Sequence, residues 1–210
     1  MCYKVQVARP TDVAARNALL DEVVAYLGEH GLADTTLRPM AAALGTTPTR
    51  LLHHFGSKSQ LIEAALLRVD EVMRQVEARW LAKAPSMSQS DILRAWWQWV
   101  TGSRRNRNLA RLGIEAATLD PAVTGLAPEI RVSRMGAWRA NIERRLIDGG
   151  VPAHLARIQA SVLEASFTGL MVDLMSGGER GRLTEALEWV LTDHDSKVER
   201  LRLIRDTNVS

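Results

Sequence analysis

Residues 36–58 read TLRPMAAALGTTPTRLLHHFGSK, and the fold depends on this stretch. Two short segments with apolar residues at helical spacing flank Gly45, where a positive φ costs little only for glycine. Met40 and Leu44 would face inward one turn apart, and Leu51 would be the inward anchor of the second segment. The stretch therefore predicts a helix-turn-helix whose corner is at Gly45.

The second helix of this motif carries its polar residues on the side away from Leu51. At about 100° per residue, Thr49 and His53 lie almost opposite Leu51, and Arg50 and Leu52 flank them. A hydroxyl, a guanidinium and an imidazole can enter a major groove, where arginine pairs with guanine O6 and N7. An ordinary helical hairpin with a solvated polar face has the same pattern, so these residues alone leave both interpretations open.

The flanks of the same helix also suit a nucleic acid. Thr47 and Pro48 begin the helix, where free N–H groups and the helix dipole favour a phosphate. Residues 35–62 contain no carboxylate, and Lys58 opens the next helix within reach of a DNA backbone. Thr46 does not fit, since an apolar side chain would suit its position better. Apart from Thr46, the segment is consistent with a DNA-binding face.

Helical spacing continues through the rest of the chain, and strand signals are weak. Clusters of Pro and Gly such as DPAVTGLAP, DGGVP and SGGERG separate the segments. We expect an all-α protein with helices at about 11–29, 37–44, 47–55, 58–83, 91–103, 107–118, 127–149, 153–176 and 180–204. A three-helix module would occupy residues 1–58 and a larger helical module residues 59–210, with the helix at 58–83 connecting them.

Composition and motifs limit the class of protein. A chain of 210 residues with 46% hydrophobic content can bury a sizeable core, and a formal net charge of +3 permits nucleic acid without requiring it. Cys2 is the single cysteine, the N-terminus lacks a signal-peptide core, and no apolar run is long enough to span a membrane. We therefore expect a cytoplasmic protein with no membrane association.

Enzyme and metal signatures are missing from the sequence. It contains no G-x-S-x-G, no P-loop, no H-E-x-x-H and no G-x-G-x-x-G. His53 and His54 are adjacent, so on a helix they point about 100° apart and are badly placed to share one metal ion. We therefore expect no catalytic residues, no metal site and no cofactor.

The segment 158–175 is apolar most of the way around a helix, so it needs cover on more than one side. One cover can be the core of the subunit and the other a second copy of the chain, joined through a four-helix interface with the last helix. The predicted dimer residues are Leu155, Ile158, Val162, Ala165, Gly169, Leu183, Leu187, Val190 and Leu191. A helix buried entirely within one subunit would show the same pattern, so that alternative stays open.

The stretch TTLRPMAAALGTTPTRLLHHFGSKSQLIEAAL resembles the DNA-binding signature of TetR-family transcriptional regulators. The matching residues are Thr35, Thr36, Arg38, Met40, Ala41, Leu44, Gly45, Leu51, His54, Phe55, Ser57, Lys58 and Leu61. The resemblance implies a homodimer with an N-terminal helix-turn-helix DNA-binding domain and a C-terminal helical ligand-binding and dimerisation domain. It also implies DNA contacts from Thr36, Thr47, Thr49, Arg50, His53, His54 and Lys58.

Two positions in the predicted DNA-binding surface depart from the family pattern. The family usually has tyrosine at the position of Leu52, where the hydroxyl touches a phosphate, and leucine can offer only an apolar contact. The family often has a basic or small residue at the position of Pro48. We expect these differences to alter the operator sequence but not the mode of docking.

Most of the aromatic content of the chain is tryptophan, of which there are six. By the resemblance, a ligand pocket lies among the middle helices, and clustered tryptophans line cavities as readily as they fill cores. The predicted pocket residues are Trp96, Trp99, Met135, Trp138, Glu164 and Phe167. A plain core role for any one of them is the alternative.

The sequence thus predicts a ligand-responsive transcriptional regulator that binds a pseudo-palindromic operator as a homodimer and acts as a repressor. Its expected partners are double-stranded DNA, a second copy of itself and a small-molecule effector. One alternative is a transcriptional activator of the same fold. The other is an all-helical ligand-binding protein or enzyme that does not bind DNA.

Overall fold

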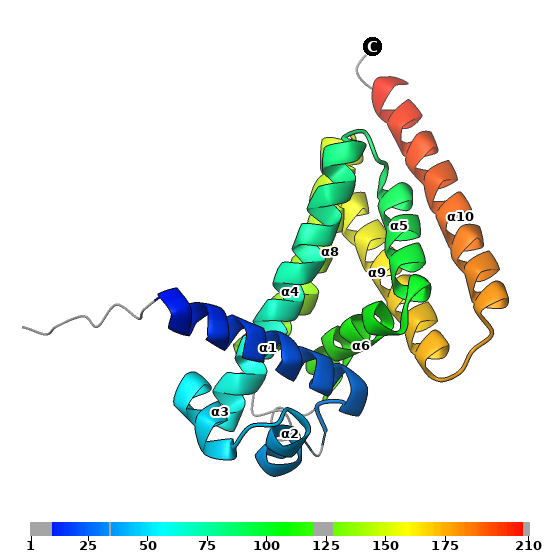
Figure 1. Cartoon of the computed structure of the whole chain (residues 1–210). Helices are drawn as coiled ribbons and strands as arrows, with labels where there is room; N and C mark the ends of the chain where they lie inside the picture. Colours follow the sequence, from blue (N-terminus) through cyan, green and yellow to red (C-terminus); the bar gives the residue numbers. More distant parts are fainter. Residues whose placement is uncertain (1–9, 34, 120–127, 208–210) are drawn as a thin grey trace, which may run out of the picture. The chain divides into compact units, whose positions relative to one another are not determined.

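The computed structural model describes residues 10–33, 35–119 and 128–207, and every regular element in them is an α-helix (Figure 1). The helices are α1 (Pro10–His30), α2 (Leu37–Ala43), α3 (Pro48–Phe55), α4 (Lys58–Lys83), α5 (Gln89–Gly102), α6 (Arg104–Thr118), α8 (Pro128–Asp148), α9 (Ala153–Met175) and α10 (Arg180–Thr207). The predicted all-α fold is confirmed, and the helix ends lie within three residues of the predicted ones. Among the described helices, none combines the length and apolar character that crossing a bilayer requires.

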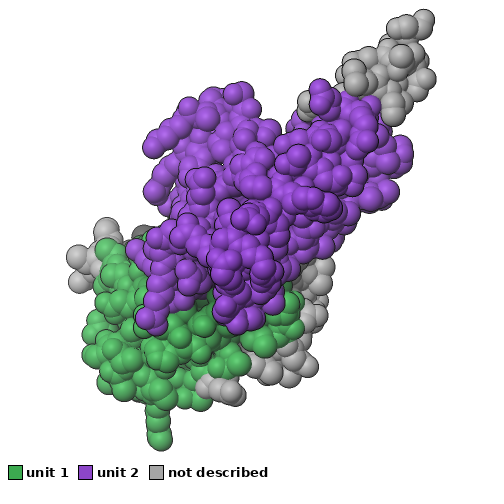
Figure 2. Space-filling view, turned by 90° about the vertical axis from the view of Figure 1, so that its right-hand side faces the viewer, with its two compact units in different colours: residues 1–74, 111–127 green, residues 75–110, 128–210 purple. Residues whose placement is uncertain are grey.

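The chain divides into two compact units, which Figure 2 colours separately. The first comprises residues 1–74 and 111–127, and the second comprises residues 75–110 and 128–210. The helices α4 and α6 therefore each contribute residues to both units.

The first unit extends beyond the predicted module of residues 1–58 because the first half of α4 supplies part of its core. Leu61, Ile62, Leu66 and Val69 are all buried. Each side chain buried in this way contributes about 1.5–3 kcal/mol, so the helix-turn-helix gains much of its stability from α4.

The corner between α2 and α3 forms as the sequence predicts. Gly45 follows the end of α2 with φ +61°, the left-handed conformation that suits glycine. The Thr46 N–H then donates to the Ala41 carbonyl at 2.9 Å, which closes the end of α2. Thr47 is the N-cap of α3, and its hydroxyl accepts the Arg50 N–H at 3.2 Å. Local residue chemistry is therefore enough to produce this turn.

The core of the first unit contains the apolar residues that the helical spacing selects. Met40 from α2, Leu51 from α3 and Leu27 from α1 are fully buried. Leu44 is only half-buried, so it contributes less to the core than the sequence predicts. The reason is its place at the C-cap of α2, where the chain has begun to turn away from the helix.

Arg16 joins α1 to the end of α3. Its guanidinium lies over the Phe55 ring, 4.8 Å from the centroid, and its Nε donates to the His54 carbonyl at 3.2 Å. This contact fixes the last turn of α3 against α1. Sequence analysis did not single out Arg16, because its partner His54 lies 38 positions away along the chain.

A second contact in the first unit joins α6 to the end of α1. Glu115 accepts the Leu32 N–H at 2.7 Å, and Arg111 donates to the Gly28 carbonyl at 2.6 Å. Arg111 and Glu115 also form an ion pair at 3.3 Å. Since these bonds satisfy backbone groups at and just after the end of α1, they determine where the chain leaves that helix.

Serines set the first residues of α4 and α5. At the start of α4, the Ser57 hydroxyl accepts the Gln60 N–H and the Gln60 side chain accepts the Ser57 N–H. Ser88 and Asp91 form a capping box, so α5 begins at Gln89, earlier than predicted. The bonds from the Ser88 hydroxyl and N–H hold the pKa of the Asp91 carboxyl below its ordinary value. The Ser-x-x-Asp spacing is the sequence signal for this earlier start.

The second unit packs α5, α8, α9 and α10 together (Figure 1). The helix α9 contacts both α8 and α10, and α10 also contacts α5. Three polar contacts among the described residues join α5 to α10. Arg94 pairs with Glu188 at 2.9 Å, the Trp97 indole donates to the Thr184 hydroxyl at 2.9 Å, and the Ser90 hydroxyl donates to Asp195 at 2.6 Å. The apolar core includes Ile92, Leu93, Val100, Ile142, Leu163, Leu183, Leu187 and Leu191.

Replacing Thr46 with valine is expected to stabilise the protein. The Thr46 hydroxyl is buried and has no hydrogen-bond partner among the described residues, at a position where the sequence pattern favours an apolar side chain. Leaving such a group unpaired costs about 1–3 kcal/mol, and valine removes it with little change of shape. The free energy of unfolding in urea should therefore rise by about 1 kcal/mol.

Thr47→Val is the matched control for this measurement. It removes the N-cap bond to the Arg50 N–H and should lower the free energy of unfolding by about 1 kcal/mol. If both variants lose stability, the Thr46 hydroxyl has a bonding partner in solution and the argument for that residue is wrong.

Candidate functional site

The outer side of α3 presents its polar side chains to solvent. Thr49, Arg50 and His53 are exposed, and Leu52 is 39% exposed, whereas Leu51 on the inner side is fully buried. In the described part of the chain, the side chains of Thr49, Arg50 and His53 have no hydrogen-bond or ion-pair partner. Their donors and acceptors are therefore available to a ligand outside the subunit.

The start of α3 offers fewer free N–H groups than the sequence analysis expected. Pro48 has no N–H, and the Arg50 N–H is taken by the Thr47 hydroxyl. Of the first three helical residues, Thr49 alone has a backbone N–H without a partner among the described residues. The expectation that Thr47 and Pro48 offer free N–H groups to a phosphate is therefore wrong. Thr47 acts as the N-cap, and the backbone donor that remains at this end of the helix is the Thr49 N–H.

The remaining predicted residues of this face lie around α3. Thr36 is exposed at the start of α2, and Lys58 is half-exposed at the start of α4. His54 is half-buried, and its ring meets that of His53 edge-on with the centroids 5.5 Å apart. Arg38 is also exposed on α2 and adds a cation that the sequence analysis used only as a match to the family pattern.

Comparison with known families identifies the module that carries this face. The family described as bacterial regulatory proteins, tetR family, matches residues 19–65, which run from α1 to the first half of α4. The N-terminal module of this chain is therefore similar to the DNA-binding module of the tetR family. The resemblance expected from the sequence is therefore confirmed. No curated protein matches the chain in sequence.

Solved structures of tetR-family and other regulators have the same fold. A TetR-family transcriptional regulator from Pectobacterium atrosepticum is 20% identical, with a TM-score of 0.57, and the match covers 93% of this chain and 97% of that one. A Rhodococcus sp. protein assigned to the TetR-family transcriptional regulators is 19% identical, with a TM-score of 0.66 and coverage of 85% and 99%. A Saccharomonospora viridis protein assigned as a transcriptional regulator, solved in complex with choline, is 19% identical, with a TM-score of 0.62 and coverage of 89% and 96%.

The predicted aromatic pocket residues fall into two ring clusters. In the first, the buried Trp96 ring meets Trp80 at 4.9 Å and Trp99 at 5.4 Å, both edge-on. In the second, Trp138 meets Phe167 edge-on at 5.5 Å. The sequence analysis placed Trp96, Trp99, Trp138 and Phe167 in one pocket, but they belong to two groups of contacts.

Glu164 is a buried carboxylate in the second unit. Burial raises the pKa of Glu164 above its ordinary value, and Arg139, at 3.5 Å, opposes that rise. This ion pair explains how α9 can bury an acidic residue. The side chain of Met135, the sixth predicted pocket residue, lies outside the described residues.

A pocket of about 460 Å³ lies between the end of α4 and α5. It is lined by Trp80, Lys83, Ala84, Met87, Ala95, Gln98 and Trp99. Of the predicted pocket residues, Trp99 lines it, whereas Trp96, Trp138, Glu164 and Phe167 do not. The sequence analysis missed Trp80 and Lys83 because the end of α4 shows no pattern that sets it apart from other solvated helix ends.

The predicted dimer residues divide between the surface and the core of the second unit. Ile158 is 57% exposed and Val162 is 49% exposed, and Ala165 and Gly169 on the same side of α9 are also exposed. Leu155 and Val190 are half-exposed.

Three leucines of α10 have to be removed from the predicted dimer surface. Leu183, Leu187 and Leu191 are fully buried within the subunit, since α10 turns this side toward α5 and α9. A partner could not reach their side chains. Trp189, which the sequence analysis did not select, is 75% exposed on α10.

Proposed function

We propose that the protein is a DNA-binding transcriptional regulator whose α3 enters the major groove. The observation that carries the proposal is the outer face of α3, where Thr49, Arg50 and His53 are exposed beside one another. Arginine can pair with two acceptors of guanine, and threonine and histidine can contact several base edges. Two copies of α3 would read a pseudo-palindromic site whose half-sites lie about one helical turn, ~34–36 Å, apart.

Charge around this face supports DNA as the partner. Residues 35–62 include Arg38, Arg50 and Lys58 and contain no carboxylate. Such a surface attracts phosphate oxygens although the net charge of the whole chain is only +3. Leu52 would meet the DNA backbone or a thymine methyl through an apolar contact.

We propose a homodimer formed through the outer face of α9. Exposed residues follow an alternating spacing of four and three positions, which is typical of a seam between packed helices. They are Ile158, Val162, Ala165, Gly169 and Val172. A Cβ atom at Gly169 would meet nothing within 4 Å, so the subunit itself does not require glycine there. Glycine would instead allow a partner helix to come close.

A groove along α10 supports the same proposal. It has a volume of about 950 Å³, and all its lining residues, Trp189 among them, belong to α10. One helix cannot enclose a small ligand, so this groove needs a second wall. A partner subunit would supply that wall and cover the Trp189 ring.

The proposed regulator responds to a small molecule held in the second unit and has no catalytic activity. The pocket beside Trp99 and the choline complex of the Saccharomonospora viridis protein support a ligand-binding role. We assign DNA reading to residues 1–58 and ligand and partner binding to residues 59–210. Repression is the simplest action, because a dimer that covers promoter DNA needs no further contact with the transcription machinery. Such a protein would act in the cytoplasm, where bacterial DNA lies.

Lys58→Gln is the experiment that tests DNA binding. Lysine at the start of α4 would pair with a backbone phosphate, so its loss should weaken binding to all duplex sequences alike. The plot of log affinity against log salt concentration should lose about 0.9 units of slope per half-site, or nearly two for the dimer. Gel-shift titrations at several salt concentrations measure both effects.

Arg180→Gln is the control, because it removes one charge from an exposed position of α10 and should leave the slope unchanged. An unchanged slope for Lys58→Gln would refute the phosphate contact. If the native protein shows no retention on duplex DNA at low salt, the alternative of a helical ligand-binding protein would replace the proposal.

A further inference from the structure

The pocket between the end of α4 and α5 has rigid aromatic walls. Trp80 and Trp99 each meet the buried Trp96 ring edge-on, at interplanar angles of 79° and 88°. The Trp96 indole donates to Glu77 at 3.2 Å, which fixes the ring that supports both walls. A volume of about 460 Å³ is in the range of small-molecule sites, and walls fixed in this way suit a planar aromatic group.

Several hydrogen-bond acceptors near this pocket already accept a bond within the protein. One carboxylate oxygen of Glu77 accepts from Trp96, and the other accepts from Asn141 at 3.4 Å. Among the backbone carbonyls, that of Trp80 accepts the Ala84 N–H at 2.9 Å. The carbonyl of Ala84 likewise accepts the Met87 N–H at 3.2 Å. A cationic ligand would have to share each of these acceptors with the bond that it already makes.

A half-buried arginine, Arg145, bonds to one residue of the pocket wall. Arg145 donates to the Met87 carbonyl at 2.8 Å, so it fixes a residue of the pocket wall and occupies one more acceptor. The Nε of Arg145 is buried and has no partner among the described residues. Arg145 forms no ion pair with a described carboxylate, so its guanidinium adds positive charge beside Met87 of the pocket wall.

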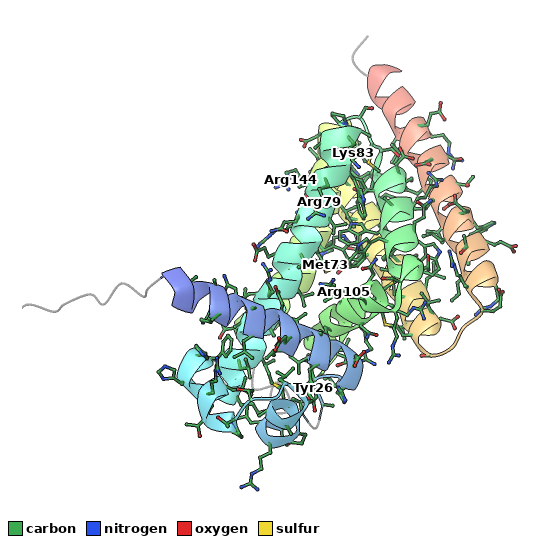
Figure 3. All side chains as sticks on the ribbon, in the orientation of Figure 1. Tyr26, Met73, Arg79, Lys83, Arg105 and Arg144 are labelled. Carbon is green, nitrogen blue, oxygen red and sulfur yellow. The ribbon has the colours of Figure 1, made fainter. Side chains whose placement is uncertain are left out.

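The donors of the pocket are free. Lys83 is exposed at the C-terminal end of α4, where Figure 3 labels it, and it lines the pocket. Gln98 lines the pocket from α5. Neither side chain makes a hydrogen bond or an ion pair in the described part of the protein. The partial negative charge at the end of α4 favours a lysine at this position. The Lys83 side chain is exposed, so its ammonium group can meet an anionic ligand.

We propose that this pocket binds a small aromatic carboxylate. The ring would lie against Trp80 and Trp99, and the carboxylate would accept hydrogen bonds from the Lys83 ammonium and the Gln98 amide. Ala84, Met87 and Ala95 complete the apolar part of the lining. Binding of the ligand to this pocket does not depend on the proposed function. Its role as the effector of a DNA-binding regulator does rest on that function.

The test compares two probes that share a ring and differ in charge. The full chain is titrated without DNA, by isothermal calorimetry, with 2-naphthoate and with 2-naphthylmethylammonium. We expect naphthoate to bind one molecule per subunit and the ammonium probe to bind at least about tenfold more weakly. Equal or tighter binding of the ammonium probe would overturn the proposal.

Three variants locate the binding of naphthoate. Lys83→Gln should weaken it by about tenfold and remove the preference for the carboxylate. Ala95→Leu fills the pocket and should abolish binding of both probes, whereas Arg74→Gln, an exposed charge change on the same helix, should leave both affinities unchanged. If the affinity for naphthoate is unchanged in Ala95→Leu, or unchanged in Lys83→Gln, the binding site lies elsewhere.

This test is separable from the test of DNA binding. If naphthoate binds as expected but Lys58→Gln leaves DNA affinity and its salt dependence unchanged, the ligand site stands and the proposed regulator fails. If Lys58→Gln behaves as expected but naphthoate does not bind, the regulator stands and the aromatic carboxylate site is wrong.

Discussion

Arg50→Ala is expected to weaken binding to a selected operator duplex by a factor of about 30 to 10⁴. A bidentate arginine–guanine pair is worth about 1–3 kcal/mol, and a homodimer would lose two of them, or about 2–6 kcal/mol. The side chain is exposed on α3 without a partner among the described residues, so its removal should leave the fold intact. Thermal unfolding of the variant should therefore match that of the native protein.

The duplex for this measurement comes from selection of random DNA with the native protein, followed by gel-shift titration. Repeating the selection with Arg50→Ala should yield sites that have lost their preference at one position of each half-site. Arg180→Ala removes the same charge from an exposed position of α10 and should change neither affinity nor preference. If Arg50→Ala selects the native sequence with native affinity, Arg50 does not read a base and another residue of α3 has to be assigned.

Val162→Asp is expected to convert the proposed dimer into monomers. Val162 is 49% exposed in the subunit, so a carboxylate there costs the monomer little. In a two-fold interface, the substitution would bury two unpaired carboxylates beside each other. A buried charge without a partner costs about 3–5 kcal/mol, so the dissociation constant of the dimer should rise by a factor of at least about 10²–10³.

Sedimentation equilibrium over a range of protein concentrations measures this effect. Val13→Asp is a closely matched control, since it makes the same change at a valine that is 47% exposed on α1. It should leave the native oligomeric state unchanged. If Val162→Asp remains a dimer over the concentrations where the native protein is one, the interface does not include the outer face of α9.

Much of the first unit could be predicted because its features depend on residues close together in the chain. Gly45 and Thr47 determine the corner between α2 and α3 through a positive φ and a side-chain cap. The helical period then places Thr49 and His53 opposite Leu51, and this placement does not depend on the rest of the chain. The exposed face of α3 is therefore a direct consequence of a short stretch of sequence.

The second unit could be predicted in outline but not in its surfaces. The segment that forms α9 is apolar on most sides, so its composition does not say which side faces the core. Leu187 on α10 has the same ambiguity, and the sequence analysis placed it in a dimer interface although it is fully buried in the subunit. The structure resolves the choice because α9 and α10 pack against each other and α10 also packs on α5.

The polar contacts that shape the pocket beside Trp99 were also beyond the sequence. The indole of Trp96 bonds to Glu77 across 19 positions, and Asn141 bonds to the same carboxylate across 64. Contacts over such separations leave no periodic signal in the chain. The sequence analysis could select tryptophans as a type, but it could not tell that Trp96 supports the walls while Trp80 forms one of them.

The sequence by itself determined the order of the helices, the corner at Gly45 and the polar face of α3, because each depends on residues within a few positions of one another. Only the tertiary structure decided which apolar sides of α9 and α10 are covered within the subunit and which donors remain free around Lys83. These depend on neighbours that are distant along the chain, and burial is a property of those neighbours as much as of the residue itself.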